Sequence, residues 1–195
     1  MNAPTLETRA GCERLGLKGP RAAEWLGAQG IDPISANTWT EAGPSTEFAG
    51  ARTAQAAAGM SQAGRVLVAQ LGTNEFFLEA DTGTRRLERL ASELARPPPG
   101  VYPVLREDSE FALAGDAVHE VLAQVCNVNF AALSLESRPV IMTLMIGVAV
   151  LVVPQSTTDG RRYRIWCDPS FGPYLGESLG QVVIDCGGSV TGVSA

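Results

Sequence analysis

Two stretches of the sequence align without a gap: Leu15-Gly16-Leu17-Lys18-Gly19-Pro20-Arg21-Ala22-Ala23-Glu24-Trp25-Leu26 and Phe111-Ala112-Leu113-Ala114-Gly115-Asp116-Ala117-Val118-His119-Glu120-Val121-Leu122. Gly115 in the second stretch aligns with Gly19 in the first. In each, an apolar strand ends in a glycine and an amphipathic pattern follows. Val118, Val121 and Leu122 have the i, i+3, i+4 spacing that places side chains on one face of a helix. The pattern predicts a strand that turns directly into a packed helix, once near each end of the chain.

A second pair of similar stretches follows the first. Phe76-Phe77-Leu78-Glu79-Ala80-Asp81 and Tyr163-Arg164-Ile165-Trp166-Cys167-Asp168 both predict a strand that ends in an Asp suited to cap a helix. Each is followed by a stripe of apolar residues at helical spacing. The sequence therefore predicts an α+β fold with two pseudo-repeated strand-helix-strand-helix lobes, whose antiparallel sheets are covered by helices.

The run Arg96-Pro97-Pro98-Pro99-Gly100 indicates where the lobes meet, because consecutive prolines cannot continue a helix. We predict a first lobe over residues 1–95, with a long irregular excursion at 31–64 that has room for a short helix near 50–60. A Pro-rich joint covers 96–103, and a second lobe covers 104–195. The second lobe is predicted to end in a helix at about 171–179, a short strand at 181–184 and a flexible tail.

Charge and hydropathy argue against several classes of function. The chain has 195 residues and a formal net charge of −6, which argues against nucleic acid or an anionic membrane as a partner. The first 13 residues contain charges and no long apolar core, so they do not resemble a secretory signal, and we expect a cytoplasmic protein. The apolar run 140–153 is shorter than the roughly 20 residues of a membrane helix. It predicts two buried strands around a tight turn.

No motif in the sequence predicts a catalytic, cofactor or metal site. The cysteines at 12, 126, 167 and 186 form no C-x-x-C pair, and His119 is the single histidine. We interpret His119 as a residue on the flank of a helix, and Cys126 and Cys167 as small core residues. Four carboxylates, Glu75, Glu79, Asp81 and Asp168, lie at predicted strand ends, where helix capping accounts for the two Asp.

The three tryptophans are candidates for burial or for contact with a partner. Trp25 lies on an amphipathic pattern and Trp166 alternates with an inward-facing Ile165, so core packing is the first interpretation of both. Trp39 lies in an irregular stretch of small residues, where a large aromatic side chain is unusual in solvent. Because aromatic side chains provide much of the energy of protein interfaces, we name Trp39, and secondly Trp25, as candidate interface residues.

Four stretches carry a resemblance to a known family: Phe111 to Ala117 with Val121-Leu122, Val125-Cys126-Asn127-Val128-Asn129-Phe130, Gly147 to Val152, and Tyr163 to Phe171. With them, the chain resembles the gamma subunits of heterotetrameric sarcosine oxidases, within the folate-linked aminomethyltransferase-like family. The resemblance is best over residues 108–180. It implies an aminomethyltransferase-like fold and a non-catalytic small subunit that docks against a larger one and stabilises it.

The resemblance also implies partners and cofactors. The alpha, beta and delta subunits would hold FAD, FMN, NAD, tetrahydrofolate and zinc, and this chain would bind none of them alone. The complex would oxidatively demethylate sarcosine or a related N-methyl amino acid. Two alternatives stay open: a stand-alone folate-linked one-carbon protein, and a small-molecule binding module with a pocket lined by Trp25, Phe76 and Trp166.

Overall fold

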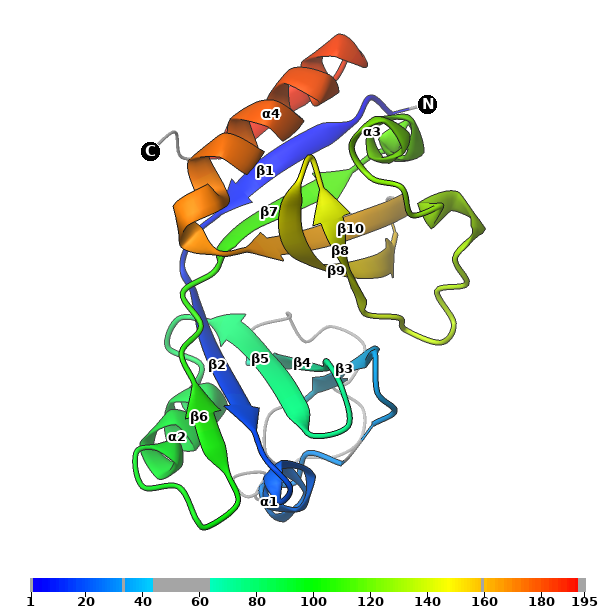
Figure 1. The fold of residues 1–195 in the computed structure, drawn as a ribbon. Helices are drawn as coiled ribbons and strands as arrows, with labels where there is room; N and C mark the ends of the chain where they lie inside the picture. The colour runs from blue at the N-terminus through cyan, green and yellow to red at the C-terminus, as the bar shows by residue number, and fades with distance from the viewer. Residues whose placement is uncertain (1, 33, 44–63, 159, 193–195) are drawn as a thin grey trace, which may run out of the picture. The chain divides into compact units, whose positions relative to one another are not determined.

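The computed structural model describes residues 2–32, 34–43, 64–158 and 160–192, and divides the chain into two compact units. The five-stranded unit is Gly11–Arg106. The six-stranded unit joins Met1–Ala10 to Glu107–Ala195 (Figure 1). Each unit has its own hydrophobic core, so each is described by itself.

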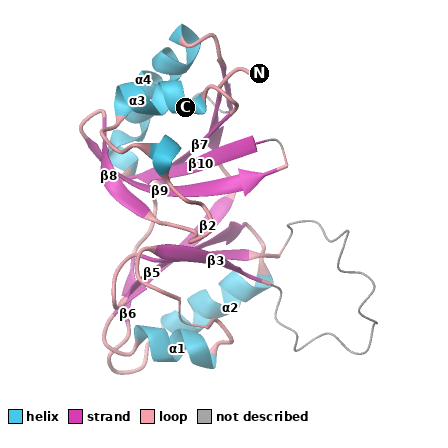
Figure 2. Ribbon diagram, turned by 90° about the vertical axis from the view of Figure 1, so that its right-hand side faces the viewer, coloured by secondary structure: helices cyan, strands magenta, loops and turns pink. Residues whose placement is uncertain are grey.

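The five-stranded unit is an antiparallel sheet with two helices. Its strands lie in the order β3-β4-β5-β2-β6. Strand β5 shows why the sheet has a helix-covered face, because Phe76, Leu78 and Ala80 alternate along it into the core with both helices (Figure 2). The elements are β2 Cys12–Lys18, α1 Ala22–Ala28, β3 Thr38–Ala42, β4 Val66–Gln70, β5 Glu75–Asp81, α2 Arg85–Leu94 and β6 Tyr102–Val104.

The six-stranded unit repeats this design with one more strand, in the order β11-β1-β7-β10-β9-β8. All neighbouring strands are antiparallel except β1 and β11. Helices α3 and α4 supply core residues such as Val121 and Leu179. The elements are β1 Thr5–Arg9, β7 Ser109–Ala114, α3 Val118–Val125, η2 Phe130–Ala132, β8 Ile141–Met145, β9 Val148–Thr157, β10 Gly160–Cys167, η3 Pro169–Phe171, α4 Gly172–Asp185 and β11 Ser189–Gly192.

The predicted repeat is present in the sheet topology. Strands β8-β9-β10-β7-β1 occupy the same successive positions as β3-β4-β5-β2-β6, and helices follow β2, β5, β7 and β10 in both units. The predicted class, antiparallel sheets covered by helices in two repeated halves, is confirmed.

Glycine is required at the two aligned turns. Gly19 and Gly115 have φ angles of 128° and 114°, which L side chains rarely adopt. A Cβ on Gly19 would lie 2.3 Å from the carbonyl oxygen of Gly100, and one on Gly115 would lie 2.5 Å from that of Ala3. The glycines permit a close approach of two backbones.

The first ten residues lie in a different place from that expected. The predicted first lobe began at residue 1, but β1 pairs with β7 and β11 and belongs to the six-stranded unit. The predicted joint at 96–103 also differs, because Val101 is buried and β6 pairs with β2. Residues as far as Arg106 therefore complete the five-stranded unit.

Three local predictions need correction. The excursion at 31–64 contains β3, which pairs with β4, whereas its suggested helix near 50–60 lies outside the described residues. Helix α4 continues to Asp185 through the residues predicted as a strand at 181–184. Part of the predicted flexible tail is β11, which pairs with β1.

The prediction of two strands around a tight turn in residues 140–153 is confirmed, but the predicted burial is wrong for β8, an edge strand on which Met142 and Leu144 are exposed. Strands β8 and β9 pair in antiparallel fashion around Ile146 and Gly147, whose φ angles of 50° and 80° fit a two-residue hairpin turn. None of the described helices is both long and apolar enough to cross a lipid bilayer.

Candidate functional site

Helix α3 and the residues after it build a pocket in the six-stranded unit. Val118, Val121, Leu122 and Val125 face the core and fix the helix on the sheet. The helix ends at Cys126, whose extended backbone directs the chain away from the helix axis toward the short helix η2. This change of direction leaves an open space between the helix and the segment that follows it.

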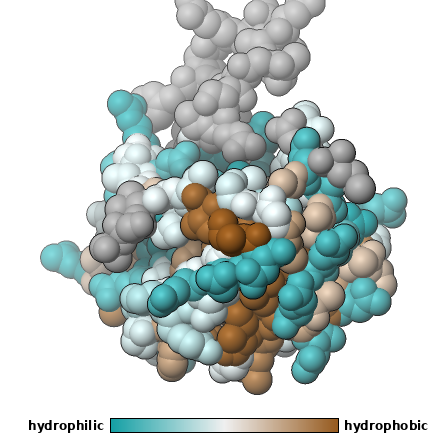
Figure 3. All heavy atoms as spheres, turned by 90° about the horizontal axis from the view of Figure 1, so that it is seen from above, coloured by the Kyte–Doolittle hydropathy of each residue, from teal (hydrophilic) through white to brown (hydrophobic). Residues whose placement is uncertain are grey.

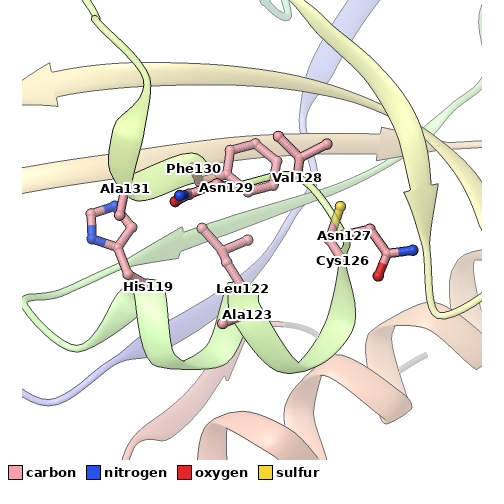
Figure 4. A pocket seen from close by; sticks show the side chains of 9 residues that line it. All are labelled: His119, Leu122, Ala123, Cys126, Asn127, Val128, Asn129, Phe130 and Ala131. Carbon is pink, nitrogen blue, oxygen red and sulfur yellow. The ribbon is translucent and has the colours of Figure 1, made fainter.

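The space is a pocket of about 370 Å³ (Figure 4), within the size range of small-molecule sites. Leu122 and Phe130 are buried apolar residues at its wall, while Asn127 and Asn129 contribute exposed amides. The full lining is His119, Leu122, Ala123, Cys126, Asn127, Val128, Asn129, Phe130 and Ala131. No acidic residue belongs to this lining.

His119 is held at one end of the pocket by Tyr163 of β10. Its Nε2 lies 2.7 Å from the Tyr163 hydroxyl oxygen, and the two rings meet edge to face at 5.8 Å. Phe130 packs on the same tyrosine at 5.4 Å. Tyr163 is fully buried, so the hydrogen bond satisfies a polar group that has no access to water.

Both partners of this hydrogen bond are uncharged at neutral pH. Burial, and then the positive charge of Arg161, lower the pKa of His119 below its ordinary value. Burial raises the pKa of Tyr163, although a hydrogen bond from Arg161 and its charge oppose the rise. A single hydrogen lies between Nε2 of His119 and the Tyr163 hydroxyl oxygen, and the tautomer of His119 decides which of the two donates it.

The cysteines near the core have the properties of structural thiols. Cys126 is buried, with its Sγ 3.7 Å from the Thr143 hydroxyl oxygen. Burial, followed by the charges of Asp108 and Asp168, raises the pKa of the Cys167 thiol to about 11. A thiol with that pKa is protonated at neutral pH and is a poor nucleophile.

The carboxylates that the sequence singled out have ordinary structural partners. Asp168 caps η3 by accepting a hydrogen bond from the Ser170 amide at 2.9 Å, as predicted. The prediction for Asp81 is wrong, since the N-cap of α2 is Thr84. Arg14 donates to Glu79 at 2.6 Å, and Arg106 donates to Glu75 at 3.1 Å.

The structure also shows a buried ionic group that sequence reasoning missed. Glu110 on β7 accepts from Arg9 on β1 and from Arg164 on β10, each at 2.8 Å. The Arg164 guanidinium lies over the Trp166 ring, 4.7 Å from its centroid. The charge pattern of the sequence offered no signal for this group, because its members come from three strands that meet only in the sheet.

The residues named for a predicted small-molecule pocket, Trp25, Phe76 and Trp166, are divided between the two units. Phe76 is buried in the core of the five-stranded unit, and Trp25 packs against that core. Trp166 is buried in the six-stranded unit. Trp39 is half-buried on β3, at the edge of its sheet and opposite Ala69 of β4.

Several large apolar side chains of the six-stranded unit are exposed. Met142 and Leu144 alternate on the edge strand β8 and are 55% and 61% exposed, and Ile184 and Val190 are about half exposed. Figure 3 shows one face of the molecule on which apolar residues form two areas separated by a strip of hydrophilic ones. Exposed apolar areas of this kind are typical of contact sites.

Comparison with known proteins identifies the class of fold. No family model and no curated protein matches the chain. A chain of the heterotetrameric sarcosine oxidase from Corynebacterium sp. U-96, in complex with pyrrole 2-carboxylate, superposes with a TM-score of 0.65 and 21% identity, over 95% of this chain and 86% of that one. The glycine cleavage system aminomethyltransferase T from Bartonella henselae superposes with a TM-score of 0.67 and 15% identity, over 98% of this chain and 48% of that one. The fold is aminomethyltransferase-like, as the sequence predicted.

Proposed function

We propose that this chain is the small, gamma-type subunit of a heterotetrameric flavin-dependent oxidase or dehydrogenase, which oxidatively demethylates sarcosine or a related N-methyl amino acid. The observation that carries the proposal is the extent of the structural match. The chain superposes on 86% of a chain from a heterotetrameric sarcosine oxidase, but on only 48% of an aminomethyltransferase. This difference favours the subunit over a stand-alone folate-linked enzyme.

The local chemistry of the described residues supports a non-catalytic role. His119 is engaged by a buried tyrosine, and Cys167 is buried with a raised pKa. Catalysis by either group would need a free proton-accepting or nucleophilic atom facing a substrate. In our proposal the chain docks against the large folate- and dinucleotide-binding alpha-type subunit and stabilises it.

The remaining components belong to the partners in this proposal. Alpha-, beta- and delta-type subunits would hold FAD, FMN, NAD, tetrahydrofolate and zinc, in a complex located in the cytoplasm. Exposed apolar residues such as Met142 and Leu144 are consistent with a chain that is buried in an assembly.

Co-expression tests the proposal directly. We would purify the chain through its own tag after co-expression with the proteins encoded beside it, and record the visible absorption spectrum. A yellow complex of several subunits is the expected result. A colourless protein purified alone would contradict the subunit assignment. That result would favour the alternative function, a small-molecule binding module.

A single substitution at Trp39 tests whether this residue contributes to the interface. We expect Trp39→Ala to weaken assembly without unfolding the chain, because the residue is half-buried on an edge strand and not part of the core cluster. Native mass spectrometry measures the assembled fraction. Trp39→Phe is the matched control and should retain most of the complex. If Trp39→Ala and the unchanged chain assemble to the same extent, Trp39 does not contribute to the interface.

A further inference from the structure

The pocket beside α3 has a positive charge at one end. Arg161 donates from Nη1 to the carbonyl oxygen of Phe130 at 3.4 Å, and its positive charge acts on His119 and on the Tyr163 that holds His119. None of the nine lining residues is acidic. Because a half-buried site screens charges less than water does, this end of the pocket favours an anion over a cation.

Polar hydrogen-bond donors lie at the same end. Asn129 uses its side-chain oxygen to accept from the Ala132 amide, so its NH₂ group remains as a donor. Figure 4 shows the Asn129 amide close to the His119 ring, with Asn127 at the other end of the pocket. Apolar groups, Leu122 and Phe130, lie between the two polar ends.

We propose that this pocket binds a small organic carboxylate, with the carboxylate at the His119 end and an apolar body against Leu122 and Phe130. A carboxylate accepts hydrogen bonds and donates none, which matches the amide donor of Asn129 and the imidazolium form of His119. The volume of about 370 Å³ has room for a benzoate-sized molecule. This binding role is independent of the proposed subunit role.

Binding of a carboxylate is coupled to protonation of His119. Two titratable side chains on β10 face the imidazole. Arg161 is positively charged and disfavours the imidazolium, and Tyr163 is neutral. Glu120 follows His119 on its own helix but is exposed, and the described residues of the pocket segment contribute no charge. A bound anion offsets the effect of Arg161, so it raises the pKa of His119 and draws a proton onto the ring.

The single histidine makes the test specific. We would prepare the full chain with a tag that lacks histidine, label its histidine with ¹³C, and titrate it with benzoate while following the His119 ring signals by NMR. The expected result is a saturable shift and a raised pKa of His119. In a reconstituted complex, labelling of this chain alone leaves His119 as the one labelled ring.

Matched ligands and variants separate charge recognition from general apolar binding. We expect benzamide, which has the same shape without the charge, to bind at least about tenfold more weakly than benzoate. Arg161→Gln should weaken benzoate binding by a similar factor. Arg162→Gln, which removes the partner of Glu7, should leave binding unchanged. Equal binding of benzoate and benzamide, or no benzoate shift in the unchanged chain, would overturn the proposal.

Discussion

At the scale of single residues, backbone geometry and buried hydrogen bonds decide which positions tolerate change. The glycines at the aligned turns and the His119–Tyr163 pair are the clearest examples. The sequence marked Gly19 and Gly115 through the repeat itself. The sequence also drew attention to His119, but it indicated no partner for the His119 side chain.

We expect Gly115→Ala to lower the free energy of unfolding by about 2–4 kcal/mol, because the new Cβ would combine an unfavourable φ with a clash against the Ala3 carbonyl. Urea denaturation measures the change. Gly147→Ala is the matched control. Gly147 also has a positive φ, but a Cβ built on it would lie in open space. Gly147→Ala should therefore lower the free energy of unfolding by only about 1 kcal/mol. Equal losses in the two variants would show that the close approach at Gly115 has no energetic consequence.

The second residue-scale prediction concerns pH. The pKa of His119 is lowered in the folded protein, so between that pKa and about 6.5 the unfolded chain binds a proton that the folded chain does not. The contribution of His119 to stability is therefore complete above about pH 6.5 and is lost progressively as the pH falls through the folded pKa. Urea midpoints at pH 7 and pH 5 should differ more for the unchanged chain than for His119→Gln. Identical pH dependence of the two would contradict the lowered pKa.

At the scale of secondary-structure elements, β1 contributes one buried leucine to the core of the six-stranded unit. Leu6 is 1% exposed in the core cluster, whereas Thr5 beside it is exposed on the other face of the strand. We expect Leu6→Ala to cost about 2–4 kcal/mol of unfolding free energy, and Thr5→Ala to change it by less than about 0.5 kcal/mol. Chemical denaturation compares the two. A small loss for Leu6→Ala would mean that β1 is peripheral to the core.

Elements with a strong hydrophobic period were predictable, and three short strands, β1, β3 and β6, were not. Strands β5 and β10 and helices α2 and α3 carry clear alternation or helical stripes. Strands β1, β3 and β6 have only three to five residues, and their pairing depends on partners far along the chain. Helix α4 was predicted too short because Val182-Val183-Ile184 favours a strand when read alone, although packing on the sheet keeps it helical.

The same limit applies to the candidate site. His119 and Cys126 are visible in the sequence, but only as a residue on the flank of a helix and as a small core residue. Tyr163 lies 44 residues beyond His119, so nothing local indicates that its hydroxyl meets the imidazole. Arg161 could be recognised only as part of a turn. Sheet register brings these residues together, and that register cannot be derived from periodicity alone.

At the scale of the whole molecule, the six-stranded unit is built from two separate parts of the chain, Met1–Ala10 and Glu107–Ala195. Strand β1 lies between β11 and β7, so its removal would leave two strand edges unpaired. The folding of this unit therefore depends on a segment that is remote in sequence.

We predict that a fragment of residues 107–195 lacks fixed structure, and that a synthetic peptide of residues 1–10 restores it. Dispersion of amide signals in NMR spectra reports the change. A peptide carrying Leu6→Ala should restore less structure, because it lacks the buried leucine. A fragment that folds without any peptide would contradict the discontinuous unit.

The position of β1 also has a consequence during translation. In the completed sheet Arg9 pairs with Glu110, so β1 leaves the ribosome long before the strand beside which it will lie. At about 5–20 residues per second, β1 waits for roughly 5–20 s while the five-stranded unit is synthesised. A strand without its neighbours has unpaired backbone groups and is prone to wrong associations during such an interval. The edges of β1 therefore stay open to other pairing until β7 and β11 have been synthesised.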